Sequence, residues 1–259
     1  MCYLEHLGEL NKKALRNIHI GTSGWSYKGW KGKFYPEELK AKDYLPFYAQ
    51  YYKVTEINSS FYRLPLASTV HNWMKKVPED FLFCPKISRY LSHMKKLNEP
   101  EEPLERFFKI FHPMKKHMGP VLIQLPASVV FNNSREERFF EILIHQYPEY
   151  TFAMEIRHKS WYSQDSLKLM KKYNISFVIA QSEQFPYKEE ITAPDIYVRF
   201  HGPKELYASS YSDKSLKEFA QKFTSWEKGG HTVWAFFNND INGHALDNSK
   251  TLMGFLEEK

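Results

Sequence analysis

Apolar and polar positions along the chain separate short strand-like runs from longer helical ones. Eight apolar runs bounded by turn residues occur at 18–24, 54–60, 81–88, 120–126, 150–157, 175–182, 195–202 and 232–240. Helical periodicity is found at 43–52, 68–77, 103–118, 134–147, 165–173, 213–228 and 248–259. Pro113 is expected to kink or split the third of these helices. Only the connection after the sixth run lacks a helical pattern.

Strands that alternate with helices over about 250 residues are typical of an α/β barrel. The sequence therefore predicts a single (β/α)8, TIM-type barrel domain over 18–259, without an evident regular helix after strand six. Residues 1–17 are expected to form an N-terminal extension. A doubly wound open sheet is the main alternative. It favours a glycine-rich phosphate loop after an early strand, and no G-x-G-x-x-G or P-loop motif occurs, so no nucleotide cofactor is indicated.

Four strands end with an apolar residue between two polar ones. These ends are Glu56-Ile57-Asn58, Lys86-Ile87-Ser88, Glu155-Ile156-Arg157 and Arg199-Phe200-His201. Since side chains alternate across a strand, the polar set is expected to point into the barrel and its mouth, and the apolar residues to face the helices. Gln124 and Gln181 are expected to join the polar set. At Asn238-Asn239-Asp240, alternation does not indicate which residues point inward.

An unpaired buried charge costs several kcal/mol, so the charged residues of this set must pair with one another or bind a ligand. Lys86, Arg157 and Arg199, with Arg89 just beyond a strand end, are suited to hold a phosphate or carboxylate. Glu155 and His201 are candidates for proton transfer. Further catalytic candidates are Glu56 and Asp240, and further ligand-binding candidates are Asn58, Gln124, His158, Asn238 and Asn239. An enzyme such as a hydrolase, lyase or isomerase that acts on a phosphorylated or otherwise anionic substrate is therefore expected. The alternatives are a non-catalytic ligand-binding or interaction module and a salt-bridge network that binds no ligand.

Two other chemistries fit the sequence less well. Glu56, Glu155, His201 and Asp240 are acceptable metal ligands, but cations on three strands would repel a divalent ion at the same mouth. No H-x-H or H-E-x-x-H spacing occurs, so a catalytic metal is not expected. The segment GTSGW at 21–25 resembles the G-x-S-x-G nucleophile motif only loosely.

The long loop at 25–42 is rich in aromatic residues and lysines. Trp25, Tyr27, Trp30, Phe34 and Tyr35 are interleaved with Lys28, Lys31 and Lys33. Trp25 and Tyr27 are counted among the candidate ligand-binding residues, because aromatic rings stack on bases or sugars while lysines hold phosphates. The alternative is an apolar lid that packs on the barrel rim.

Charge and cysteine content indicate which partners and which cellular compartment are expected. The net charge is +6, a mild excess that fits either solvated helix faces or an anionic partner, so a small anion and a nucleic acid both remain candidates. The only cysteines, Cys2 and Cys84, suggest no disulfide framework. The N-terminal segment lacks the apolar core of a signal peptide, and no apolar stretch approaches 18 residues. A cytoplasmic protein without a membrane partner is expected, and its oligomeric state is not predicted.

Six motifs together resemble the domain-of-unknown-function 72 family, also called YecE-like. They are GTSGWSYKGWKGKFYP, EINSSFYRLP, KISRYLSHMKKL, EIRHKSW, YVRFHGP and FFNNDINGHALDN, in order from about residue 18 to residue 250. The resemblance implies a TIM-barrel-like fold but no established activity. Members of the family have been compared with endonuclease-IV-like and sugar-isomerase-like barrels, and nucleic-acid binding has been suggested. A trinuclear zinc site of the endonuclease-IV type needs more inward His and carboxylate ligands than this sequence offers.

Overall fold

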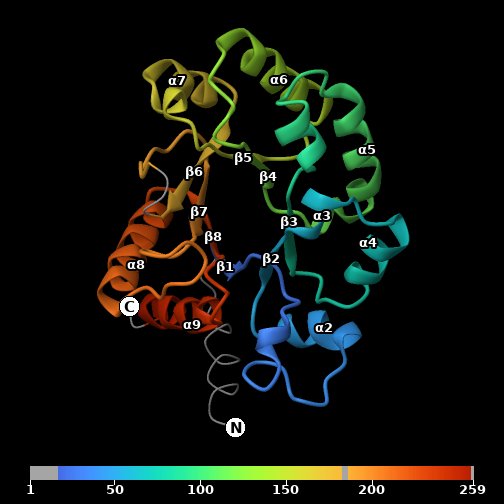
Figure 1. Ribbon diagram of the computed structural model, residues 1–259, viewed down its shortest axis with the longest axis vertical. Coiled ribbons are helices and arrows are strands. Elements are labelled where there is room, and N and C mark those ends of the chain that lie inside the picture. The colour runs from blue at the N-terminus through green and yellow to red at the C-terminus, as the bar shows by residue number, and fades with distance from the viewer. Residues whose placement is uncertain (1–16, 183–185, 258–259) are drawn as a thin grey trace.

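The computed structural model describes residues 17–182 and 186–257. Eight parallel strands surround a common axis in the order β3-β2-β1-β8-β7-β6-β5-β4 (Figure 1). The strands are β1 (Ile18–Thr22), β2 (Val54–Ile57), β3 (Leu82–Pro85), β4 (Val121–Gln124), β5 (Phe152–Glu155), β6 (Ile175–Gln181), β7 (Asp195–Phe200) and β8 (Thr232–Phe237). Each lies within one of the eight predicted runs, which confirms the barrel fold. The expected extension at 1–17 lies outside the described residues, apart from Asn17.

Helices pack around the outside of the strands at the predicted places (Figure 1). The main ones are α2 (Tyr44–Tyr48), α4 (Ala67–Met74), α5 (Glu101–Phe111), α6 (Asn133–Gln146), α7 (Gln164–Lys172), α8 (Asp213–Lys228) and α9 (His244–Glu257). Pro113 has the expected effect, because α5 ends at Phe111 and the chain continues as a 3-10 helix, η4 (His112–His117). Between β6 and β7, residues 182 and 186–194 contain no helix. Within the described ranges, every helix is too short or too polar to cross a membrane.

The loops after β2 and β3 contain two short elements that the periodicity did not indicate. One is α3 (Ser59–Tyr62), and the other is a single π-helical segment, η3 (Tyr90–Met94). Such π-helical turns are rare and occur frequently at functional sites. Both elements follow the carboxyl ends of their strands, so they contribute side chains to the mouth of the barrel.

The seam between β3 and β4 is the weakest part of the barrel wall. Two isolated bridges join the strands there, Phe83 to Met118 and Lys86 to Leu122. Pro85 and Pro120 lie between these bridges and have no N–H to donate to the ladder. From the first bridge to the second, the chain advances three residues on the β3 side, from 83 to 86, and four on the β4 side, from 118 to 122. The β4 side therefore contains one extra residue, as in a β-bulge. Side chains at this seam therefore have a greater part in holding the strands together.

The apolar residues form two separate clusters, one inside the barrel and one between the strands and helices. The interior cluster contains Val54, Cys84, Leu122, Ala153, Val178, Tyr197, Trp234 and Phe236. Ile57, Ile156 and Phe200 belong instead to the outer cluster that faces the helices. This division confirms the predicted alternation of the strands. Each polar candidate two residues beyond an interior residue therefore lies on the inward face, one layer nearer the mouth.

The aromatic loop after β1 packs against the barrel. Trp30, Phe34 and Tyr35 are at most 1% exposed, and the Trp30 and Tyr48 rings stack with centroids 6.3 Å apart. The packing interpretation is therefore correct for these three rings. Tyr27 is half-buried and lies at the mouth, while Lys28 is exposed.

Candidate functional site

A polar layer lies directly above the apolar floor of the barrel. Five inward residues belong to it, each two positions beyond an interior residue of its strand: Glu56 above Val54, Lys86 above Cys84, Gln124 above Leu122, Glu155 above Ala153, and Arg199 above Tyr197. All five are at most 7% exposed. Polar groups this deep must be satisfied by one another or by a ligand.

Arg199 joins two buried carboxylates on opposite parts of the wall. Its Nε and Nη2 donate to the two oxygens of Glu56, both at 2.9 Å, and its Nη1 donates to Glu155 at 2.6 Å. Tyr197 and Ser23 donate further hydrogen bonds to Glu56, at 2.8 and 2.5 Å. Burial opposes the charge on Arg199, but the two carboxylates outweigh it and raise its pKa well above the usual value. Arg199 is therefore a fixed cation that two carboxylates already neutralise.

Glu155 is the acceptor of a second arginine and a histidine. Arg157 donates from Nε and Nη2 to one oxygen of Glu155, at 3.1 and 2.9 Å, and His201 Nε2 lies 3.3 Å from the other oxygen. Burial opposes ionisation of Glu155, yet Arg199, His201 and Arg157 together hold its pKa well below the usual range. Glu155 is thus ionised, and this geometry suits it to orient the two arginines.

His201 lies beneath the mouth and is 0% exposed. Its Nδ1 lies 3.1 Å from the amide nitrogen of Asn238, so Nδ1 is the acceptor there and Nε2 carries the hydrogen that faces Glu155. Burial lowers the pKa of His201, and Glu155 offsets only part of that effect. His201 is therefore a neutral imidazole that links Asn238 to the carboxylate.

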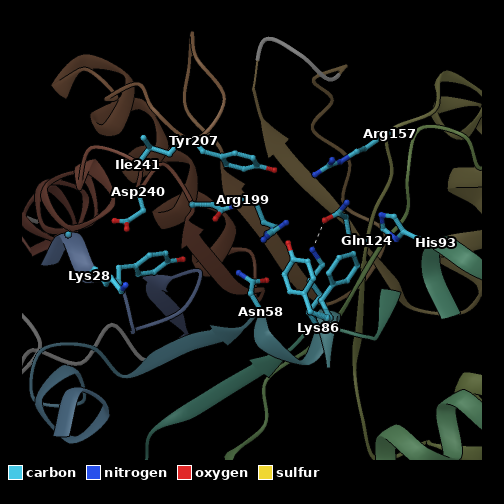
Figure 2. A pocket seen from close by; sticks show the side chains of 15 residues that line it. Lys28, Asn58, Lys86, His93, Gln124, Arg157, Arg199, Tyr207, Asp240 and Ile241 are labelled. Carbon is cyan, nitrogen blue, oxygen red and sulfur yellow. Dashed lines mark hydrogen bonds between the residues drawn. The ribbon is translucent and has the colours of Figure 1, made fainter. Parts of the chain in front are cut away.

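A cavity of about 640 Å³ opens above this network at the carboxyl ends of the strands. It is lined by Tyr27, Lys28, Gly29, Asn58, Phe61, Tyr62, Lys86, His93, Gln124, Arg157, Arg199, Tyr207, Asn238, Asp240 and Ile241. Figure 2 shows Lys86, Gln124, His93 and Arg157 on one side of it, and Lys28, Asp240 and Ile241 on the other. The volume is in the range of small-molecule sites.

Among the lysines that the structure describes, Lys86 has the environment that differs most from that of a surface ammonium. Its Nζ donates to Gln124 Oε1 at 2.5 Å, across the seam between β3 and β4, and lies 4.2 Å from the Phe61 ring centroid. No carboxylate of the described residues forms an ion pair with it. Burial, followed by the nearby charge of Arg199, lowers the pKa of Lys86 from 10.5 to about 7. Both the amine and the ammonium form are therefore populated near neutral pH.

Asp240 is the acidic group of the opposite side. Its carboxylate accepts a hydrogen bond of 2.6 Å from Trp30 Nε1. Burial raises the pKa of Asp240 to about 6, and the bond from Trp30 and the charge of Lys33 partly oppose this shift. The neighbouring Asn239 points away from the cavity and donates to Ser209 O and Asn248 Oδ1, at 3.0 and 2.8 Å. The sequence left open which of residues 238–240 point inward. In the structure, Asn238 and Asp240 lie on the cavity side.

Asn58 carries a buried oxygen with an unused acceptor position at the same cavity. Its Nδ2 donates to Ser23 O at 2.9 Å, but its Oδ1 has no hydrogen-bond partner within the described part of the chain. A buried unsatisfied acceptor costs about 1–3 kcal/mol. An O–H or N–H group of a ligand in the cavity is one way to satisfy it.

Several predicted site residues lie elsewhere. Arg89 is exposed and does not line the cavity. His158 caps the 3-10 helix η5 (Lys159–Tyr162), where its Nδ1 accepts from Ser160 N at 3.2 Å. Trp25 packs edge-on against Trp73, with centroids 5.4 Å apart. None of these three residues lines the 640 Å³ cavity, although Trp25 lines a smaller pocket beside it together with Glu56 and Asn58.

Other cavity residues were not among the predicted candidates. Phe61 and Tyr62 come from α3, His93 from η3, and Tyr207 from the loop after β7. Burial and the charges of Lys86 and Arg157 lower the pKa of His93 to about 4, so its ring is neutral. Strand alternation says nothing about residues on loops. Phe61, Tyr62 and His93 lie within the motifs EINSSFYRLP and KISRYLSHMKKL, but these motifs do not indicate which of their side chains reach the cavity. In residues 17–182 and 186–257, no three His, Cys, Asp or Glu side chains gather in a group that suits a metal ion.

Comparisons with known proteins agree with this architecture. YunF of Bacillus subtilis is 24% identical over 275 residues, which cover 93% of this chain and 95% of YunF. YecE of Escherichia coli is 26% identical over 148 residues, which are 56% of this chain and 50% of YecE. A DUF72 family protein of Thermotoga maritima superimposes with a TM-score of 0.83 at 29% identity, over 93% of this chain and 99% of that one. A DUF72 protein of Enterococcus faecalis shares the fold, with a TM-score of 0.79 at 20% identity over 93% and 95% of the two chains. The sequence profile described as "Protein of unknown function DUF72" matches residues 19–259, and the chain therefore belongs to that family.

Proposed function

We propose that this protein is an enzyme that binds a small anionic substrate in the cavity at the carboxyl end of the barrel. The observation that carries the proposal is the position of Lys86, a cavity-lining lysine that forms no ion pair with a carboxylate of the described residues. Arg157 supplies a second cation on the same side of the cavity (Figure 2). A phosphate or carboxylate group bound there has two cationic contacts and the amides of Asn58 and Gln124 close by.

The balance of charge supports an anionic ligand. The two buried carboxylates, Glu56 and Glu155, are matched by the two arginines that contact them, Arg199 and Arg157. A protonated Lys86 then adds a positive charge with no counterion in the polar layer. Uncompensated buried charge costs several kcal/mol, and an anion in the cavity removes that cost.

The buried network gives these cations a fixed geometry. Glu155 holds Arg157 by two hydrogen bonds, and Glu56 and Glu155 hold Arg199 by three. Pre-organised donors lose little entropy when they bind, which favours tight and specific anion contacts. We assign the network this positioning part and assign proton transfer to the cavity-facing groups with pKa values near neutrality, Lys86 and Asp240.

Nucleic-acid binding is the second candidate, and the exposed residues of the rim favour it. Tyr62 lines the cavity and is 74% exposed, and Lys28, Lys31 and Lys33 are exposed on the nearby loop. Exposed aromatic rings beside lysines suit single-stranded nucleic acid. Fluorescence anisotropy with labelled single- and double-stranded DNA and RNA at low salt tests this candidate, because phosphate contacts are strongest there.

Calorimetric titration with sulfate and with inorganic phosphate tests the anion site. Lys86→Met should weaken binding about tenfold or more, as expected for a lost hydrogen bond to a charged group. Lys116→Met is the matched control, since this lysine is exposed on η4 away from the cavity, and it should leave the affinity unchanged. At pH 8, Lys86 should take up a proton when sulfate binds, because the anion stabilises the protonated lysine. This uptake is measured as a difference in the heat of binding between two buffers of unequal ionisation enthalpy. No binding, or equal loss in both variants, contradicts the proposal.

A further inference from the structure

We propose that Lys86 is an amine nucleophile that forms an imine with the carbonyl group of the substrate. The inference deepens the proposed function and rests on it for the substrate class, a small molecule that carries both an anionic group and a ketone or aldehyde. It assigns a covalent part to the one cation of the polar layer that has no carboxylate ion-pair partner among the described residues.

The backbone of Lys86 is held firmly at the wall of the cavity. Its N–H donates to Ile57 O at 3.2 Å, and its carbonyl oxygen accepts from Ser60 Oγ at 2.6 Å. The side chain then passes the Phe61 ring and ends at Gln124 Oε1, with 7% of the residue exposed. A nucleophile fixed at both ends presents its nitrogen in a narrow range of positions, which favours attack on a bound carbonyl carbon.

The surroundings of Nζ favour the neutral amine over the ammonium. Its hydrogen-bond partner, the amide oxygen of Gln124, is uncharged, and Nζ is buried. The nearby charges of Arg199 and Arg157 oppose the ammonium, and those of Glu155 and Glu56 offset only part of the combined effect. Lys172 provides a contrast, because its Nζ lies 2.6 Å from the Glu137 carboxylate and its pKa is raised. Desolvation and a neighbouring cation are the usual means of activating a lysine nucleophile, and the pKa of about 7 fits this function.

The step is balanced without a further reactant. The Nζ lone pair attacks the carbonyl carbon, and the π electrons of that bond move to the oxygen. The two hydrogens of the amine leave with that oxygen as water, and the C=N bond forms. The imine nitrogen then takes up one proton from solvent, which makes an iminium that withdraws electrons from the neighbouring carbon. Nothing is oxidised or reduced, and the anionic group of the substrate offsets the positive charge of the iminium.

The arrangement of the cavity indicates which carbonyl compounds fit. Arg157 lies on the same side as Lys86, and Asp240 lies on the opposite side (Figure 2). An anionic group near Arg157 is therefore kept away from the carboxylate, with the carbonyl carbon within reach of Nζ. Short 2-oxo acids and phosphorylated sugars of three or four carbons carry both groups and are small enough for a cavity of about 640 Å³. Reactions that break a bond next to the carbonyl carbon are the class that an iminium at this position supports.

Reductive trapping tests the inference directly. The intact protein is incubated at pH 7 with cyanoborohydride and one of three probes, namely pyruvate, glyceraldehyde 3-phosphate or the neutral acetaldehyde. Modified lysines are located by peptide mass spectrometry. We expect the adduct to form on Lys86 at least about tenfold faster than on the exposed Lys116, because at pH 7 about half of Lys86 is the free amine. Sulfate should slow trapping of the two anionic probes.

Two variants distinguish loss of the nucleophile from loss of the folded structure. Lys86→Arg retains the cation and the anion site but cannot form an imine, so it should still bind sulfate and lose the adduct. Arg157→Gln should slow trapping by the anionic probes more than trapping by acetaldehyde, because it removes an anion contact in addition to one of the cations that favour the free amine of Lys86. If wild-type protein binds sulfate but Lys86 reacts no faster than Lys116 with all three probes, the inference is overturned and the anion site stands. If acetaldehyde modifies Lys86 rapidly but sulfate does not bind, the nucleophile stands and the anionic substrate class falls.

Discussion

Replacing Lys86 with methionine should change how the stability of this protein depends on pH. In the folded protein the pKa of Lys86 is about 7, against 10.5 for the group in water. Between these two values the unfolded chain binds more protons than the folded one, so this lysine makes stability rise with pH. Its protonation therefore costs the fold about 5 kcal/mol below pH 7, and nothing above pH 10.5.

The variant lacks this contribution, so the difference in free energy of unfolding between Lys86→Met and wild type should depend on pH. About 2 kcal/mol of the cost remains at pH 9, against nearly all of it at pH 6. The free energy of unfolding of Lys86→Met, relative to wild type, should thus fall by about 2–3 kcal/mol from pH 6 to pH 9. Loss of the hydrogen bond to Gln124 Oε1 adds a penalty of about 1–3 kcal/mol that does not vary with pH. The change of this difference with pH therefore reflects the ionisation of Lys86, whereas its constant part also includes the lost hydrogen bond.

Urea unfolding at pH 6, 7, 8 and 9, followed by circular dichroism, measures this slope. Lys116→Met is again the control, because the ammonium of that exposed lysine is in water before and after unfolding. Its difference from wild type should be the same at every pH. A flat difference for Lys86→Met as well would mean that Lys86 is solvated in the folded protein, which would refute both the burial argument and the nucleophile drawn from it.

Two further substitutions test the buried ion-pair network and the acidic side of the cavity. Glu56→Gln should destabilise the protein by about 3–5 kcal/mol in urea unfolding, since it takes a charge partner from a fully buried guanidinium, whereas Glu137→Gln at a partly exposed ion pair should cost less than about 1 kcal/mol. Equal losses would contradict the energetic account of the network. Asp240→Asn should tighten sulfate binding several-fold at pH 8 and leave it unchanged at pH 5, because the pKa of Asp240 is about 6 and its carboxylate repels an anion only when ionised. If Asp240→Asn binds sulfate as tightly as wild type at both pH values, the anion binds too far from Asp240 to be repelled by its carboxylate.

The strands and the inward face of the polar layer could be read from the sequence because both are local properties. The alternation in Tyr197-Val198-Arg199 fixes which side chains share a face once the segment is a strand. Six helical patterns separate the strands and a seventh follows the last one. Alternation failed where strands ended. Strand β8 stops at Phe237, so the directions of Asn239 and Asp240 depend on loop contacts, with Asn248 and Trp30 respectively.

The sequence by itself thus determined the barrel, the alternation of its strands and the residue types at its mouth. Only the tertiary structure decided how these charges are partnered. Glu56 and Arg199 are far apart in the chain, yet their contact neutralises the arginine, while Lys86 meets an amide and an aromatic ring. The energy of a charge depends on the distance to other charges and on the depth of water exclusion, and neither quantity is a local property of the chain. Which cation remains for a ligand is therefore a result of the fold.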